Sequence, residues 1–125
     1  MLAAAASVLA TAALGCKKGD AAEDTIGPTV EATALSARLG DVAAGRVAVF
    51  YVGPEMLFGR GHVPGARRLP PVESKEGEQA LARAVAETPA GVEIVVYCGC
   101  CPYRSCPNVR PASRVLRASG RADAR

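Results

Sequence analysis

Two nearly uninterrupted runs of apolar residues stand out along this chain, and both are rich in β-branched side chains. They cover residues 46–52 (RVAVFYV) and residues 92–97 (VEIVVY). Runs of this length and composition are typical of strands that are buried on both faces of a parallel sheet. A third, shorter strand is predicted at residues 67–69, just before Pro70 and Pro71.

Segments with a helical spacing of apolar residues separate and follow these strands. They cover residues 33–44, 76–87 and 108–119. Gly45 and Gly120 are suited to end a helix, and Asn108 is suited to cap the start of the last one. In the middle helix, Leu81 and Val85 are expected to face the core. Strands that alternate with helices predict an α/β fold with a parallel sheet and crossover connections.

The N-terminal part of the chain differs in character from the rest. Residues 1–15 form an uncharged apolar run with the length of the hydrophobic region of a secretory signal. Cys16 follows in a context that resembles a bacterial lipobox, in which the cysteine is lipidated; an ordinary signal peptide or a buried N-terminal helix is the alternative. We therefore expect a signal peptide with a lipobox (residues 1–16), a flexible tether (residues 17–30) and one domain (residues 31–125).

Composition limits the kinds of partner that this domain can have. The chain has 125 residues, enough for one small domain, and its formal net charge is only +3. Aromatic residues make up 4% and Trp is absent, so a base-stacking surface for nucleic acid is not expected. With 1 His in the sequence, we expect neither a His-rich metal site nor Cys–His catalysis.

The residue directly after the second long strand is Cys98, which opens a cysteine-rich loop (CGCCPYRSCPN). In open α/β sheets, chemistry takes place at the carboxyl ends of strands, so Cys98 is a candidate catalytic residue. Arg104 completes a C-x5-R pattern in which a thiolate and a guanidinium can share one bound anion. The remaining candidates for contact with a substrate are Gly99, Tyr103, Ser105 and Arg110.

Residues 49–70 (VFYVGPEMLFGRGHVPGARRLP) contain the hexapeptide GHVPGA, and residues 95–98 read VVYC. Together these two segments resemble a rhodanese-like domain. The signature residues of this hexapeptide are Gly61, His62, Pro64 and Gly65. The resemblance implies a three-layer α/β domain with a central parallel sheet, which here lacks the family's C-terminal strand and helix. It also implies transfer of sulfane sulfur through a persulfide on Cys98.

The chain also departs from that family. Tyr51 and Gly53 stand where the family usually has Asp-x-Arg, so the acidic and basic pair is missing. Family members with a C-x5-R loop act as phosphatases or arsenate reductases, but Pro102 and Pro107 each remove a backbone donor from such an anion site. For His62, a structural hydrogen bond in its turn is favoured over a role as a general acid or metal ligand.

The four cysteines of the loop allow three interpretations. In the first, Cys98 carries the persulfide and Cys100, Cys101 or Cys106 resolves it by forming a disulfide. In the second, thiolates bind zinc or copper(I), although the spacing lacks the paired C-x2-C of zinc sites. In the third, disulfides only stabilise the loop of an exported protein, for instance a disulfide that joins Cys106 to Cys98 or to Cys101. The sequence leaves the connectivity open.

These observations lead to a functional prediction. We expect a monomeric, membrane-anchored lipoprotein of the bacterial cell envelope, with its domain in the periplasm and without a cofactor or bound metal. Cys98 would take sulfur from a small anionic donor, with Arg104 holding that donor, and pass the sulfur to a thiol acceptor. The alternative is a non-catalytic rhodanese-like module for protein interaction, metal binding or thiol redox chemistry.

Overall fold

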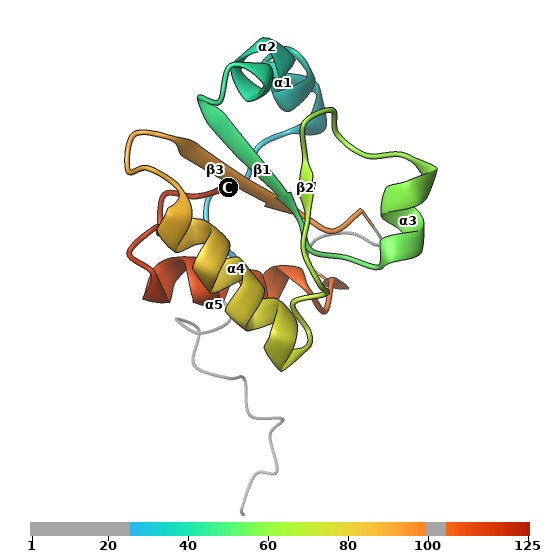
Figure 1. The fold of residues 1–125 in the computed structure, drawn as a ribbon, viewed down its shortest axis with the longest axis vertical. Coiled ribbons are helices and arrows are strands. Elements are labelled where there is room, and N and C mark those ends of the chain that lie inside the picture. The colour runs from blue at the N-terminus through green and yellow to red at the C-terminus, as the bar shows by residue number, and fades with distance from the viewer. Residues whose placement is uncertain (1–25, 100–104) are drawn as a thin grey trace, which may run out of the picture.

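The computed structural model describes residues 26–99 and 105–125 (Figure 1). Within them, the strands are β1 (Val47–Tyr51), β2 (Arg67–Arg68) and β3 (Glu93–Tyr97). These strands pair in parallel in the order β2-β1-β3. The long pair is in register from Val47 opposite Glu93 to Tyr51 opposite Tyr97. The parallel sheet predicted from the alternation of strands and helices is therefore confirmed.

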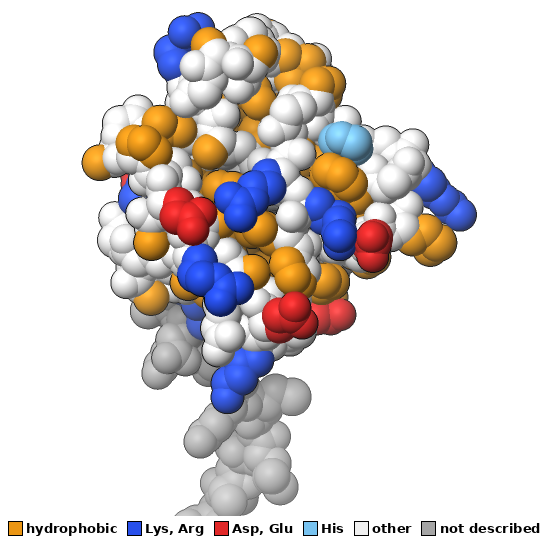
Figure 2. Space-filling model, in the orientation of Figure 1, with side chains coloured by type: hydrophobic (Ala, Val, Ile, Leu, Met, Phe, Trp, Pro, Cys, Tyr) orange, Lys and Arg blue, Asp and Glu red, His pale blue; other side chains and the backbone are white. Residues whose placement is uncertain are grey.

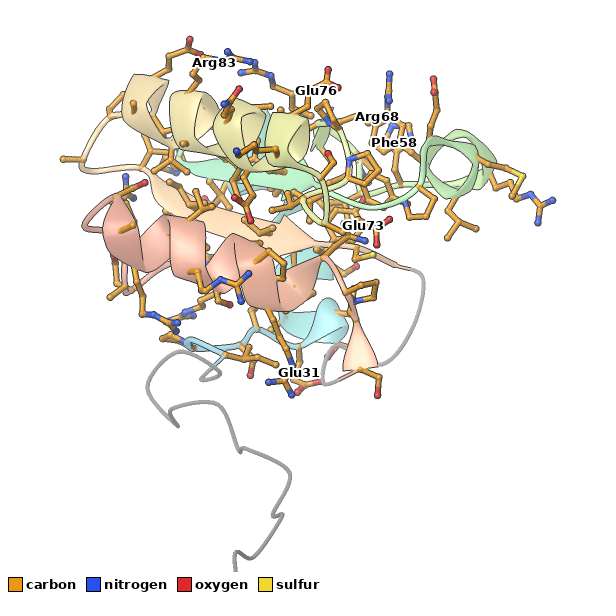
Figure 3. The ribbon with its side chains drawn as sticks, turned by 90° about the horizontal axis from the view of Figure 1, so that it is seen from below. Glu31, Phe58, Arg68, Glu73, Glu76 and Arg83 are labelled. Atoms are coloured by element: carbon orange, nitrogen blue, oxygen red, sulfur yellow. The ribbon has the colours of Figure 1, made fainter. Side chains whose placement is uncertain are left out.

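Helices lie on both faces of this sheet. The helices are α1 (Ala32–Ser36), α2 (Leu39–Ala43), α3 (Glu55–Arg60), α4 (Lys75–Glu87) and α5 (Val109–Ala118). The α1 and α2 helices pack on one face, whereas α4 and α5 lie side by side on the other (Figures 1 and 3). The α3 helix follows the carboxyl end of β1 at the side of the domain. The described residues thus form an α/β unit with helices, sheet and helices in successive layers.

Burial of β1 and β3 on both faces creates two hydrophobic clusters. The cluster under α4 and α5 includes Phe50 and Ile94 from the strands and Leu81 from α4. The cluster under α1 and α2 contains Val49 and Val95 together with the neighbouring side chains Leu35, Val42 and Val47. Alternate residues of each strand therefore enter opposite clusters, as expected for a strand without a polar face. The inward orientation predicted for Leu81 and Val85 is confirmed.

The helix predicted at residues 33–44 is wrong as a single element. The chain leaves helical geometry at Arg38 (φ −114°, ψ 19°), so that two short helices form. The Arg38 guanidinium donates to Glu93 Oε2 at 2.7 Å and to Asp41 Oδ2 at 3.2 Å. Because Glu93 lies 55 residues away, this tertiary interaction has no signature in the local apolar pattern. The end of the segment at Gly45, which has a φ of 76°, is as predicted.

The ion pairs around Arg38 make stability depend on acidity. Hydrogen bonds from Arg46 and Arg38 lower the pKa of Asp41 below its ordinary value of 3.8. A hydrogen bond from Arg38 likewise lowers the pKa of Glu93 below 4.5. A carboxylate whose folded-state pKa is depressed stabilises the fold above its ordinary pKa, and this contribution is lost as pH falls through the depressed value.

We therefore expect the free energy of unfolding to decline as the pH is lowered from about 5 toward 2. Urea unfolding at a series of pH values measures this decline. Glu93→Gln should lower the free energy of unfolding at pH 7. It should also make the decline at low pH shallower, because this position no longer takes up a proton as the pH falls. Glu76→Gln, an exposed position of α4, is the matched control and should leave the profile unchanged. An identical decline at low pH in Glu93→Gln would show that this carboxylate is not linked to folding.

Candidate functional site

Cys98 lies directly after β3, where this strand leaves the sheet. Its residue exposure is only 3%. The position is the carboxyl end of a parallel strand, which is where open α/β sheets place their reactive groups. The structure thus puts the predicted nucleophile at the expected edge of the sheet, but in a buried environment.

Asn108 is the buried polar residue that contacts this thiol. It is 2% exposed, and its Oδ1 accepts a hydrogen bond from the backbone N–H of Glu73 at 3.0 Å. Its Nδ2 lies 3.6 Å from Cys98 Sγ and donates to it. Glu73, labelled in Figure 3, lies in the loop that leads into α4. Because the Glu73 N–H can only donate, it fixes which end of the amide is oxygen, and the NH₂ group must face the sulfur.

The predicted capping role of Asn108 is therefore wrong in its detail. Asn108 does stand at the N-cap position of α5, but its side chain makes no capping hydrogen bond. Its amide instead joins α5 to the Glu73 loop and to the end of β3. No sequence signal distinguishes these two uses, because the Glu73 partner lies 35 residues away.

Gly53 forms a second wall of the thiol site. A Cβ atom at this buried position would lie 2.8 Å from Cys98 Sγ and 2.5 Å from the Cys98 carbonyl oxygen. It would also lie 2.8 Å from the hydroxyl of Tyr51, which donates to the Pro54 carbonyl oxygen at 2.7 Å. Gly53 thus lies against the thiol, and the Tyr51 hydroxyl lies against Gly53. The two positions at which the sequence resemblance predicts Asp-x-Arg hold a phenol and a residue without a side chain.

Aromatic rings extend from Tyr51 toward α3 and the hexapeptide turn. The Tyr51 ring has its centroid 5.2 Å from that of Tyr97 and 5.2 Å from that of Phe58. The Phe58 ring stacks on His62 at 3.8 Å. His62 Nδ1 lies 3.0 Å from the Phe58 carbonyl oxygen, so the ring makes a local structural hydrogen bond, and its side chain is exposed.

The other residues of the hexapeptide belong to the turn between α3 and β2. The backbone N–H of Val63 donates to the hydroxyl of Tyr97 at 2.9 Å, which ties this turn to β3. Gly65 has a φ of 84° and lies against Val42 of α2. Gly61 and Pro64 are exposed. The hexapeptide therefore supports the site through Tyr97.

Only some of the remaining predicted site residues lie in the part of the chain that the structure describes. Cys106 is 1% exposed, and neither it nor Cys98 is in a disulfide. Gly99 and Ser105 are exposed, and Arg110 is half-buried in the first turn of α5. The other predicted site residues, which are Cys16, Cys100, Cys101, Tyr103 and Arg104, lie outside the described residues.

The described part of the chain holds neither a candidate metal cluster nor a candidate membrane span. Across residues 26–99 and 105–125, no three His, Cys, Asp or Glu side chains come together as potential metal ligands. In the same ranges, no helix has the length and apolar character that crossing a bilayer requires. The predicted lipid anchor lies outside these ranges, whereas the last five residues of the predicted tether, residues 26–30, are described. There, Val30 packs against the cluster that contains Leu35 and Val42.

Comparison of the chain with models of protein families, with curated proteins and with solved structures finds no match. The site is therefore interpreted from its own geometry. That geometry is a buried thiol at a strand end, which receives an amide hydrogen bond and faces a position without a side chain.

The amide contact predicts the reactivity of Cys98. Asn108→Asp keeps an oxygen for the Glu73 N–H but replaces the donor beside the sulfur with a carboxylate, which disfavours the thiolate. We expect alkylation of Cys98 by iodoacetamide at pH 7 to slow about tenfold. The difference should shrink at high pH, where the thiol ionises in both proteins. Equal rates at pH 7 would mean that the amide does not act on the sulfur.

Proposed function

We propose that this protein is a thiol-dependent sulfurtransferase or persulfide carrier with a rhodanese-like fold, and that Cys98 carries the sulfur. The observation that carries the proposal is the position of the Cys98 thiol at the carboxyl end of β3, within reach of the Asn108 amide. A polarised donor beside a sulfur favours its anionic form, which is the nucleophile in sulfur chemistry. The hexapeptide turn and its link to Tyr97 support the same assignment.

The loading step is a displacement at sulfur. The Cys98 thiolate attacks the outer, sulfane sulfur of an anionic donor such as thiosulfate. A new S–S bond forms on Cys98 while the S–S bond of the donor breaks, and sulfite leaves with the electron pair. A thiol acceptor then takes the outer sulfur and returns Cys98 as the thiolate. Arg104 is proposed to hold the anionic donor, and Cys100, Cys101 or Cys106 to resolve the persulfide.

The cellular setting is part of the same proposal. We infer an N-terminal lipid on Cys16, a tether from residue 17 and a monomeric domain in the periplasm of a bacterium. The apolar run at residues 1–15 and the charged segment after it support this setting.

A second candidate function has its own support in the structure. Cys98 and Cys106 are both buried, and the ionic pair expected beside the nucleophile is replaced by Tyr51 and Gly53. A non-catalytic module, in which these thiols serve stability, redox chemistry or a protein contact, is consistent with such burial.

Catalytic turnover of a sulfur donor distinguishes the two candidate functions. The reduced protein, freed of reductant, is incubated with thiosulfate and glutathione, and the release of sulfite and sulfide is followed. The proposed function predicts catalytic release of both products in amounts that exceed the protein. If neither thiosulfate nor glutathione persulfide supports turnover, the non-catalytic module is the better account.

A further inference from the structure

A cavity of about 530 Å³ runs along the outer edge of β3 and reaches Cys98. Its two side walls are largely apolar, with Leu35 on the α1 side and Ala112 and Leu116 on the α5 side. Figure 3 shows the segment that leads into α1, marked by Glu31, running alongside α5. The volume is in the range of ligand-binding sites, and the wall chemistry favours an apolar occupant.

The floor of this cavity is the hydrogen-bonding edge of a strand. Residues 93, 95 and 97 direct their backbone N–H and C=O groups toward β1. The backbone groups of the even-numbered residues of β3 therefore point toward the cavity. Arg125 already pairs there: its N–H donates to the Ile94 carbonyl at 2.9 Å, and its carbonyl accepts from the Val96 N–H at 2.6 Å. These two bonds have the pattern of a parallel strand pair. The C-terminus accordingly lies beside β3 in Figure 1.

The pairing by Arg125 covers only the first part of this edge. The next acceptor toward Cys98 is the Val96 carbonyl, and within the described residues no backbone N–H donates to it. A carbonyl in an apolar cavity is stabilised by a donor, and a second strand provides donors at the correct spacing. An occupant that contacts the two apolar walls and donates hydrogen bonds to the edge of β3 is apolar on two faces and carries backbone amides along one edge.

We propose that the cavity binds an extended, apolar polypeptide segment that runs parallel to β3 and continues the pairing begun by Arg125. Arg125 lies at the level of Val95, and four extended residues beyond it span about 13 Å, which takes the segment to the level of Gly99. Main-chain hydrogen bonds would provide affinity, and the two apolar walls would select the side chains. A segment bound in this way passes next to Cys98.

Together with the proposed sulfur transfer, this geometry assigns the acceptor to the class of protein thiols. The cysteine thiolate of the bound segment attacks the outer sulfur of the Cys98 persulfide. The S–S bond on Cys98 breaks as the S–S bond on the segment forms, and Cys98 leaves as the thiolate. This extension rests on the proposed function, whereas binding of the segment does not.

Binding is tested without any sulfur chemistry. The probe is a fluorescein-labelled peptide of sequence Lys-Val-Ile-Val-Ser-Ala-amide, and the protein is the full chain with Cys98→Ser, so that no persulfide can form. Two isomeric peptides carry N-methyl groups on alternate residues, one on each edge of the extended backbone. We expect the parent and one isomer to bind with similar affinity in fluorescence anisotropy. The other isomer should bind at least about tenfold more weakly, because it loses the donors that face β3.

A pair of protein variants locates the binding site. Ser113→Trp places a large ring in the cavity wall on α5, whereas Ala118→Trp adds the same ring at an exposed position of α5 outside the wall. Only Ser113→Trp should weaken binding of the parent peptide, by about tenfold or more. Circular dichroism and thermal unfolding check that both variants fold. If Ser113→Trp does not fold, the comparison of the two methylated peptides still tests the proposed binding mode.

Three results would overturn the proposal. The first is no change in anisotropy up to about 1 mM peptide. The second is equal binding, or equal loss of binding, by the two methylated isomers. The third is dimerisation of the protein alone that Ser113→Trp abolishes, which would mean that a second copy of the chain fills the cavity. If the peptide binds and Cys98 can be loaded, but a cysteine version of the peptide receives no sulfur, the assignment of protein thiols as acceptors fails. If the peptide binds but Cys98 cannot be loaded at all, the cavity assignment stands and the proposed function fails.

Discussion

Cys98→Ser is expected to abolish thiosulfate-dependent sulfite release, with a loss of about 10³-fold or more. A hydroxyl at this position is too weak a nucleophile to displace sulfite from a sulfane donor, and it cannot carry a stable outer sulfur. Serine is nearly isosteric with cysteine, so the contact with Asn108 and the packing at the end of β3 should persist. Release of sulfite from thiosulfate in the presence of glutathione measures the effect, and thermal unfolding shows whether the fold is retained.

Cys106→Ser is the matched control for this experiment. Cys106 is as deeply buried as Cys98, with exposures of 1% and 3%, but it lies near the end of the loop, before α5, and does not end a strand. If Cys106 acts only in resolution, Cys106→Ser should keep the loading step and slow the release of sulfur to the acceptor. Loss of loading in Cys106→Ser with normal loading in Cys98→Ser would move the nucleophile to Cys106.

Gly53→Ala should impair both the site and the fold. Its Cβ would come within 2.5 Å of the Cys98 carbonyl oxygen and within 2.8 Å of the Cys98 sulfur, so the end of β3 has to shift. Overpacking of this kind costs about 1–3 kcal/mol of folding free energy. Because the shift changes the position of the sulfur relative to Asn108, we also expect the rate of Cys98 alkylation to change. Urea unfolding and alkylation kinetics measure the two effects.

Gly59→Ala is the control for the glycine substitution. Gly59 lies in α3 with no atom within 4 Å of its Cβ position. Alanine there should be neutral or stabilise the helix by up to about 1 kcal/mol. A Gly53→Ala protein as stable and as reactive as Gly59→Ala would contradict the close approach of Gly53 to Cys98.

The strands and the longer helices could be predicted because their signals are local. In β1 and β3 the apolar run is the direct result of burial on both faces, and the structure places their ends within one residue of the predicted limits. In α4, Ser74 accepts a hydrogen bond from the Gly77 N–H at 3.0 Å, and Leu81 is fully buried. Each of these features depends on residues that are close in sequence.

Other features depend on contacts between distant residues and could not be read from local patterns. The break between α1 and α2 accompanies the pairing of Arg38 with Glu93, and the α3 helix was not predicted. Within the site, the sequence indicated Cys98 but not its surroundings. The role of Asn108 depends on the Glu73 backbone, and the proximity of Gly53 to the sulfur depends on the packing of β1 against β3.

Intact mass spectrometry tests the central claim most directly. The purified full chain is reduced, freed of reductant, incubated with thiosulfate and compared with an untreated sample, and the modified residue is located by peptide mapping after alkylation. The proposed function predicts a gain of one sulfur, about 32 Da, on Cys98. This gain should be absent in Cys98→Ser. A mass that does not change when the reduced protein is incubated with thiosulfate would contradict the sulfur-carrier assignment and favour a structural role for these thiols.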